Sequence, residues 1–127
     1  MKKDKRTVLI VDDDADIRDL MKIILEHEGY RVNVAADGFE ALQQLQAGAH
    51  PSLILLDLMM PRMDGEQFLK EMRSTRFSQT PVIIMSGHAA AQTKANELHV
   101  DFCLMKPVEC SELLTTVKRF TTSVTTT

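Results

Sequence analysis

The sequence predicts an α/β protein with a parallel sheet and helices on both faces of that sheet. Short apolar segments alternate with amphipathic segments about five times along the chain, which is the order expected for a parallel sheet with crossover helices. Several apolar segments are hydrophobic throughout, as strands buried on both faces are. Right-handed crossovers are expected between the strands. Because all strands of a parallel sheet point the same way, their carboxyl ends should meet at one edge of the sheet.

Five segments are expected to form the strands. Four of them are apolar or β-branched runs, and the second alternates apolar and polar residues, as a strand near the sheet edge does. In chain order the segments are 7–11, 30–35, 53–57, 81–85 and 101–105.

Helices are expected between the strands. The first follows Asp14, whose carboxylate can cap a helix start, and it ends at Gly29. Asp37-Gly38 is expected to form a turn before a short helix that ends at Gly48. The apolar faces have helical spacing and comprise Ile17, Leu20, Met21, Ile24 and Leu25; Ala41, Leu42 and Leu45; Phe68, Leu69 and Met72; and Leu113, Leu114, Val117 and Phe120.

The later helices carry weaker signals. Gly65 precedes the third helix, and residues 89–98 form an Ala-rich helix with little apolar surface. We expect Ser111 to cap the last helix.

The composition fits one globular domain over residues 1–127. Hydrophobic residues make up 44% of the chain and charged residues 26%, which are ordinary values for a protein with a core. A net charge of -3 predicts no surface for nucleic acids or anionic membranes. We expect residues 1–6 to form a basic leader and the Thr-rich residues 121–127 to form a frayed tail.

The sequence contains no targeting or membrane signal. It has no apolar run long enough to span a bilayer, and no signal peptide precedes the first expected strand, so we expect a cytoplasmic protein. Cys103 and Cys110 lack metal-ligand spacing and indicate free thiols in a reducing compartment. The four histidines are scattered, and none pairs with another at the spacing of metal ligands.

Asp57 stands at the carboxyl end of the third expected strand, the edge where open α/β sheets place their chemistry. Alone, Asp57 is equally well explained as a turn residue, because Asp is common in turns. Other expected strands also end in polar residues, however, and the agreement among them favours a shared site. These residues are Asp12 and Asp13, Ser86, and Lys106.

The acidic residues suit a magnesium site. Carboxylates gathered near Asp57 raise each other's pKa above the free value of about 3.9, and a divalent cation removes this penalty. Mg²⁺ prefers carboxylate, carbonyl and water oxygens. We expect Asp13 and Asp57 to bind Mg²⁺ directly, Asp12 to bind it through water, and the backbone carbonyl of Met59 to supply a further oxygen. Such a cation favours transfer of a phosphoryl group to Asp57 as the nucleophile.

Lys106 and Ser86 fit the same chemistry. Lys106 would balance charge on the transferring oxygens, and the Ser86 hydroxyl could donate a hydrogen bond to one of them. Taken singly, a lysine at a strand end is usually solvated and a serine there usually forms a turn.

Several segments resemble the receiver domain of bacterial two-component response regulators, in particular the single-domain type found in the chemotaxis receiver. They occur in the family's order and span nearly the whole chain: 8–14 (VLIVDDD), 57–65 (DLMMPRMDG), 81–87 (PVIIMSG) and 106–107 (KP). The resemblance implies a flavodoxin-like, doubly wound (βα)5 sandwich whose five-stranded parallel sheet has the order 2-1-3-4-5.

The resemblance also implies a role for each site residue. Asp57 matches the phosphoryl acceptor, Asp12 and Asp13 match the acidic pair that holds Mg²⁺, and Ser86 matches the hydroxyl residue that turns toward the phosphoryl group. Lys106 matches the lysine of the family motif, and the peptide bond before the following proline is expected to be cis.

The implied partners follow from the same resemblance. The donor would be a phosphohistidine on a sensor histidine kinase or a histidine phosphotransfer protein, and a downstream effector protein would read the result. The phosphoryl group would then be lost by hydrolysis. The output surface is expected on residues 89–98, the last strand and the last helix.

Two positions depart from the family pattern. The family often has an aromatic residue three positions before the lysine, which swings inward when the hydroxyl residue moves. Here that position holds Cys103, with Phe102 beside it, so an ordinary aromatic switch is not expected. The usual Gly-Ala before the last strand is His99-Val100, which we expect to change only the loop.

We therefore expect a signalling phosphoacceptor rather than an enzyme, with no nucleic-acid binding by this domain. The alternative is an adaptor with the receiver fold that works without phosphorylation; a turnover phosphatase is less favoured, because no second acid is placed for acid–base catalysis. Met59 and His88 either flank the path of the attacking water or are simple loop residues; in the first case the apolar Met59 predicts slow self-dephosphorylation. The chain is expected to be either a complete single-domain regulator or a receiver from a longer protein.

Overall fold

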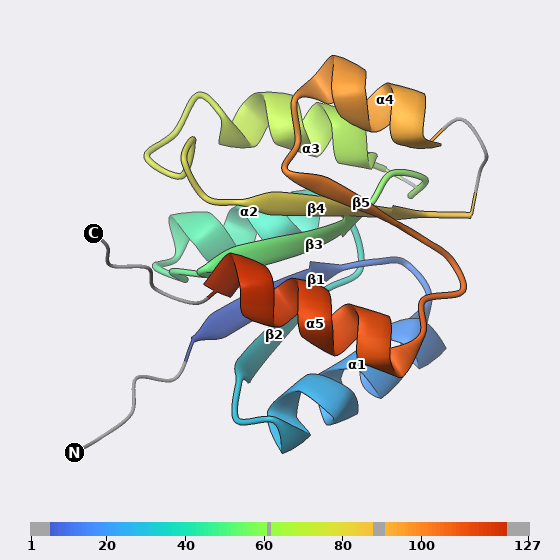
Figure 1. The fold of residues 1–127 in the computed structure, drawn as a ribbon. Helices are drawn as coiled ribbons and strands as arrows, with labels where there is room; N and C mark the ends of the chain where they lie inside the picture. Colours follow the sequence, from blue (N-terminus) through green and yellow to red (C-terminus); the bar gives the residue numbers. More distant parts are fainter. Residues whose placement is uncertain (1–5, 61, 88–90, 122–127) are drawn as a thin grey trace, which may run out of the picture.

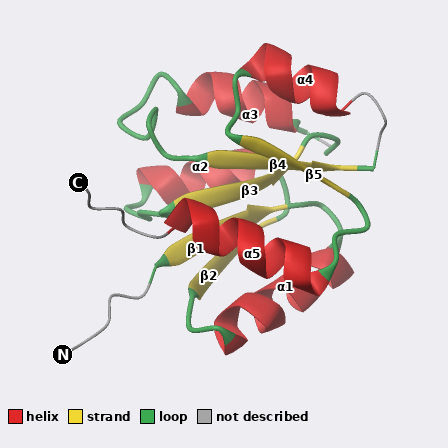
Figure 2. Ribbon diagram, in the orientation of Figure 1, coloured by secondary structure: helices red, strands yellow, loops and turns green. Residues whose placement is uncertain are grey.

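In the computed structural model, which describes residues 6–60, 62–87 and 91–121, a parallel sheet lies between two layers of helices (Figures 1 and 2). The described strands form one five-stranded sheet with the order β2-β1-β3-β4-β5, as expected. The strands are β1 Thr7–Val11, β2 Arg31–Ala35, β3 Leu53–Asp57, β4 Val82–Ser86 and β5 Phe102–Met105. The helices are α1 Ala15–His27, α2 Gly38–Gln46, α3 Gly65–Met72, α4 Ala91–Leu98 and α5 Cys110–Thr121.

Alternation along the strands divides the core between the two faces of the sheet. In β1, Val8 and Ile10 pack with the buried residues of α1 and α5, whereas Leu9 and Val11 pack with those of α2 and α3. Figure 1 shows the same division, with α1 and α5 on one side and α2, α3 and α4 on the other. Every residue of β3 and β4 is buried, as the continuous apolar runs predict for strands covered on both faces.

The local signals for the first helices are confirmed with small changes. The carboxylate of Asp14 accepts hydrogen bonds from the N–H groups of Asp16 and Ile17 and so caps α1. Asp37 and Gly38 do not form an independent turn, because Asp37 caps α2 and Gly38 is the first residue of that helix.

Two predictions about helix residues are wrong. Leu20 is 58% exposed because it lies at the edge of the apolar stripe of α1, whereas Met21 and Leu25 near the centre are buried. Ser111 does not cap α5, because the helix begins one residue earlier and the N–H of Leu113 already donates to the carbonyl of Glu109.

The peptide bond between Lys106 and Pro107 is cis, as expected. None of the helices in the described ranges is long and apolar enough to cross a membrane. Residues 1–5 of the expected leader, residues 122–127 of the expected tail, Pro61 and His88 lie outside the described residues. Thr121, which was expected in the frayed tail, is instead the last residue of α5 and is buried.

The start of α3 packs directly against the end of β3. Gly65 is buried, and its N–H donates to the carbonyl of Leu58 at 3.1 Å. A Cβ atom on Gly65 would lie 2.7 Å from the carbonyl oxygen of Asp57 and 2.8 Å from the Cα of Leu58. Both contacts involve backbone atoms, so a side chain at this position requires the strand end or the helix to move.

We predict that Gly65→Ala lowers the free energy of unfolding by roughly 1–3 kcal/mol, because overpacking at a rigid contact has this cost. Urea unfolding measures the effect. Gly87→Ala is the matched control, since a Cβ there meets its nearest atom only at 4.0 Å. Equal stabilities of the two variants would contradict the close approach at Gly65.

Candidate functional site

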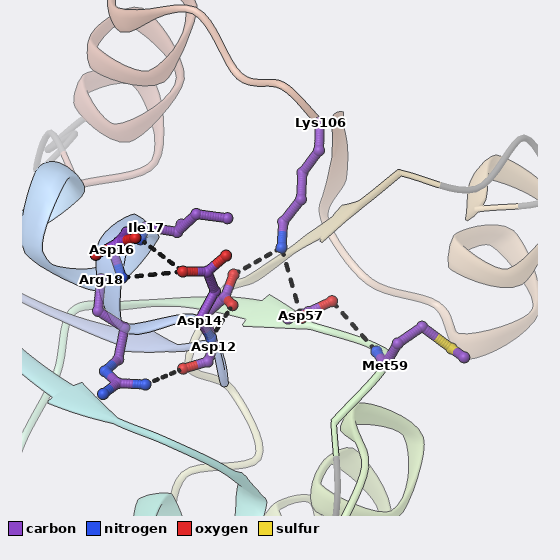
Figure 3. Close-up of polar contacts among 8 residues, drawn as sticks. All are labelled: Asp12, Asp14, Asp16, Ile17, Arg18, Asp57, Met59 and Lys106. Atoms are coloured by element: carbon purple, nitrogen blue, oxygen red, sulfur yellow. Dashed lines mark hydrogen bonds and ion pairs between the residues drawn. The ribbon is translucent and has the colours of Figure 1, made fainter.

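The carboxyl ends of β1, β3 and β5 bring three acids and a lysine together, as the sequence predicted. Ligand oxygens of Asp12, Asp13 and Asp57 all lie within 4.8 Å of one another. The Nζ atom of Lys106 is 2.8 Å from Oδ2 of Asp12 and 3.5 Å from Oδ2 of Asp57. Figure 3 shows the lysine side chain reaching between the two carboxylates.

Asp12 is held in place from several directions. Its side chain is fully buried, with Oδ1 accepting the N–H of Asp14 at 2.9 Å and Oδ2 accepting Lys106. Its backbone carbonyl accepts a hydrogen bond from Arg18 at 2.8 Å (Figure 3). The neighbouring Asp13 is exposed, so a solvated cation can approach the cluster from that side.

Asp57 is almost fully buried, with 5% of its surface exposed. Burial raises the pKa of this carboxyl; the charge of Lys106 opposes the rise, and the charges of Asp12 and Asp13 add to it. Oδ1 also accepts the N–H of Met59 at 3.2 Å. The ionised form of Asp57 is therefore disfavoured in the absence of a further cation.

Lys106 supplies the positive charge of the cluster. Burial alone would lower the pKa of its ammonium, but the hydrogen bond and charge of Asp12 and the charge of Asp57 raise it above its ordinary value. Lys106 is consequently charged at neutral pH and already neutralises part of the acidic cluster.

The donor set fits a magnesium ion. Three carboxylates face one ammonium, so the cluster keeps excess negative charge. The atoms that these acids offer to a metal ion are all carboxylate oxygens. Burial first, and then the charges of Asp12 and Asp13, raise the pKa of Asp57, and a bound cation would favour its ionised form. The N–H of Met59 faces Asp57, and the participation of its carbonyl stays a prediction.

Ser86 ends β4 between the strands that carry Asp57 and Lys106. Asp57 pairs with Met85 in the β3–β4 register, so Ser86 lies one step further along the same strand. Ser86 is 2% exposed, and its carbonyl accepts the N–H of Lys106 at 2.8 Å. Its position at the cluster edge agrees with the prediction, and its donation to a phosphoryl oxygen stays a prediction.

The aromatic residue next to Cys103 faces the opposite side of the sheet. In the β4–β5 register, Cys103 pairs with Ile84 and Phe102 pairs with Ile83. The ring of Phe102 lies against Phe120 of α5, with ring centroids 6.0 Å apart. Burial raises the pKa of the half-buried Cys103 thiol, which keeps it uncharged. Phe102 therefore does not replace an inward-swinging ring on the α4 side.

The loop before β5 shows what the His99-Val100 departure changes. His99 has a left-handed backbone with φ of 55°, a conformation that glycine adopts without strain. The guanidinium of Arg73 donates to the carbonyls of Leu98 and His99, the latter at 2.9 Å. The loop is thereby fixed to the end of α3, and the expectation that the departure changes only this loop stays a prediction.

Sequence reasoning missed residues that position the acids. Arg18 lies one turn into α1 and donates a hydrogen bond to the carbonyl of Asp12. From the sequence alone, an arginine at this position is expected to be a solvated helix residue. Arg62 pairs with the buried Asp37 across two loops, at 2.6 Å. No spacing pattern in the sequence connects these two residues.

Comparison with known proteins identifies relatives of this chain. The model of the response regulator receiver domain matches residues 8–118. A transcriptional regulatory protein of Haemophilus influenzae, a CpxR homolog, is 39% identical over 113 residues, which cover 87% of this chain and 48% of that protein. The regulatory protein AtoC of Escherichia coli is 37% identical over 88% of this chain and 24% of its own length. This chain thus spans about half or less of these curated relatives.

A solved structure supports the same relationship. The chemotaxis protein CheY4 of Vibrio cholerae superimposes with a TM-score of 0.84 at 32% sequence identity. The match covers 92% of this chain and 99% of the CheY4 chain.

We predict that Asp57→Asn stabilises the metal-free protein in a pH-dependent way. The native pKa of Asp57 lies above its ordinary value of 3.8, so the associated stability is present below pH 3.8 and is lost as the pH rises through the native pKa. Asparagine does not ionise, and the variant avoids this loss. Its stability advantage over the wild type should therefore grow through this window and stay constant up to neutral pH.

Urea unfolding in the presence of a chelator, at a series of pH values, measures this difference. Asp16→Asn is the control, because Asp16 is exposed in the first turn of α1. A stability difference that stays flat or shrinks with rising pH would show that the native pKa of Asp57 is not raised.

Proposed function

The chain belongs to the response regulator receiver domain family, and from that premise we propose that Asp57 accepts a phosphoryl group in a magnesium-dependent reaction. The observation that carries the proposal is the convergence of Asp12, Asp13, Asp57 and Lys106 at one edge of the sheet. Two of these acids, Asp12 and Asp57, are buried. Lys106 donates a short hydrogen bond to Asp12 but lies 3.5 Å from Asp57, without a short hydrogen bond to it.

The proposed reaction is a transfer between two nucleophiles. A carboxylate oxygen of Asp57 attacks the phosphorus of a phosphohistidine, a P–O bond forms, and the P–N bond breaks to release the imidazole, which takes up a proton. The product is an acyl phosphate on Asp57. Attack of water on that phosphorus later breaks the new P–O bond and returns the carboxylate and inorganic phosphate.

Each residue of the site would have its own role in the transfer. Asp13 and Asp57, with Asp12 and the Met59 carbonyl, would hold Mg²⁺, which when bound supplies positive charge opposite the phosphoryl oxygens. Lys106 is already charged and within reach of Asp57, so it can stabilise the oxygens during transfer. Ser86, at the end of the adjoining strand, would donate a hydrogen bond to the bound phosphoryl group.

The acyl phosphate would then change the surface around β4 and β5. A doubly charged group at the sheet edge attracts Lys106 and the hydroxyl of Ser86. The described part of α4 has limited apolar contact with the sheet: Ala95 is 3% exposed and Leu98 is partly buried. We place the output surface on α4, β5 and α5, where a small displacement of α4 changes the surface that contacts a partner protein.

The proposed partners are a sensor histidine kinase or a histidine phosphotransfer protein upstream and an effector protein downstream. In this scheme the chain is a signalling acceptor rather than an enzyme with turnover, and the free thiols Cys103 and Cys110 suit a cytoplasmic setting. The Haemophilus influenzae relative is named as a transcriptional regulatory protein and the Escherichia coli relative as a regulatory protein, but the output of the parts of these proteins outside the match is not carried over to this chain. No observation on the described residues favours the alternative of a phosphorylation-independent adaptor.

We predict that Asp57→Asn abolishes labelling by a small acyl phosphate in the presence of Mg²⁺, because the acceptor oxygen is replaced by an amide. Intact-mass spectrometry detects the added phosphoryl group. Asp16→Asn, which changes an exposed acid on α1, should label as the wild type does.

In the same experiment, Lys106→Ala should keep partial labelling but lose the conformational response, followed as amide chemical-shift changes in α4 and β5. Full labelling of Asp57→Asn would exclude Asp57 as the acceptor. An unchanged response in Lys106→Ala would exclude the proposed role of the lysine.

We predict that Met59→Asn shortens the lifetime of the acyl phosphate. The Met59 side chain is 61% exposed beside Asp57, and an amide there can orient the attacking water where a thioether cannot. The decay of the phosphorylated form, measured by intact mass after removal of the donor, should become several-fold faster. Met59→Leu serves as the apolar control, and equal decay of the two variants would assign Met59 no role in the lifetime.

A further inference from the structure

The loop between β3 and α3 is attached to the connection between β2 and α2 at two points. The Nε atom of Arg62 lies 2.6 Å from Oδ2 of Asp37. One residue further along each segment, the N–H of Gly38 donates to the carbonyl of Met63 at 3.1 Å. A Cβ on Gly38 would lie 2.9 Å from that same carbonyl oxygen, so the two segments touch closely.

Asp37 is positioned to bind the guanidinium of Arg62 from this loop. It is 4% exposed, and its Oδ1 atom accepts the N–H of Glu40 at 2.9 Å, which caps α2. Burial raises the pKa of Asp37, but the hydrogen bond from Glu40 and the guanidinium of Arg62 hold the pKa below its ordinary value. Asp37 is therefore a charged group with one oxygen fixed in a helix cap and the other directed at Arg62.

Arg62 adopts an unusual conformation to reach this carboxylate. Its φ angle is 62°, in the left-handed region that side-chain-bearing residues adopt against steric repulsion. Its side chain is 59% exposed, but the guanidinium lies 5.3 Å from the ring centroid of Phe39 and is fixed between the ring and Asp37. An exposed arginine with no role would be expected to extend into solvent on a relaxed backbone.

The other end of the same loop lies in the acidic cluster. The N–H of Met59 donates to Oδ1 of Asp57, and the N–H of Gly65 closes the loop onto the carbonyl of Leu58. Arg62 is thus three residues from Met59 and connects the outer side of the loop to α2. The attachment therefore lies three residues along the chain from Met59, whose N–H donates to Asp57.

We propose that the Asp37–Arg62 ion pair is a positioning element of the site: it holds the β3–α3 loop where the Met59 backbone and Asp57 together face the cation. The pair does not touch the cation, and it acts through the loop. This inference rests on the proposed function, because it concerns the affinity of the same site for Mg²⁺. Residues that orient metal ligands commonly change metal affinity by about 10- to 100-fold.

The test is a Mg²⁺ titration of the unphosphorylated, full chain, followed by amide chemical shifts and giving a Kd for each variant. We expect Arg62→Ala and Asp37→Asn each to weaken Mg²⁺ binding by roughly tenfold, at the lower end of that range. Arg76→Ala is the matched control: Arg76 also lies over a phenylalanine ring, 4.8 Å from Phe77, but follows α3 at the opposite end of the helix. We expect its Kd to equal that of the wild type.

Thermal unfolding of the same variants separates positioning from stability. If Arg62→Ala lowers the melting temperature but binds Mg²⁺ as tightly as the wild type, the pair is merely structural and the inference is overturned. Arg62 is exposed, and its removal leaves the α2 cap in place. Arg62→Ala therefore tests the positioning role even if Asp37→Asn does not fold.

Asp13→Ala, measured in parallel, distinguishes this inference from the proposed function. A wild type that binds no Mg²⁺ would refute both. Binding that is lost in Asp13→Ala but unaffected in both Asp37→Asn and Arg62→Ala would refute only the positioning role.

Discussion

The ion pair of Lys106 with Asp12 is the contact on which the site depends. In the sheet order, Lys106 follows the edge strand β5, whereas Asp12 follows β1 and Asp57 ends β3. One side chain therefore ties the adjacent ends of β1 and β3 to the end of β5, across the intervening strand β4. Removing the ammonium would leave buried carboxylates facing each other without compensation, which is far more costly than losing a surface ion pair. Asp12 and Asp57 can be buried here because the partly buried Lys106 places a positive charge beside both carboxylates.

The sequence carried enough information to predict the sheet and the converging strand ends. Continuous apolar runs such as 53–56 require burial on both faces, and parallel strands place the residues after each run at one edge. For this reason the sequence predicted that Asp12, Asp57 and Lys106 lie at the same edge. Assigning individual roles to them needed the resemblance to the receiver family, because spacing alone did not distinguish an acceptor from a ligand.

Other features were beyond sequence reasoning for physical reasons. The apolar stripe of α1 gave no measure of how far the sheet extends beneath it, so Leu20 was wrongly placed inside. The Asp37–Arg62 contact joins residues 25 positions apart in two loops, where no periodicity applies. The shift of the aromatic residue from position 103 to Phe102 was visible in the sequence, but strand register was needed to show that its ring packs on α5.

The bond between Arg73 and the end of α4 has a mechanical consequence. The guanidinium holds the carbonyls of Leu98 and His99, so the carboxyl end of α4 is fastened to the end of α3. Along the helix, Lys94 reaches Glu66 of α3 only at 3.5 Å, through side chains that are largely solvent-exposed. Any tilt of α4 is thus a rotation about a fixed carboxyl-terminal pivot, and its amplitude grows toward the first turn. The first turn, which such a rotation would displace most, lies toward the edge of the sheet where β4 ends.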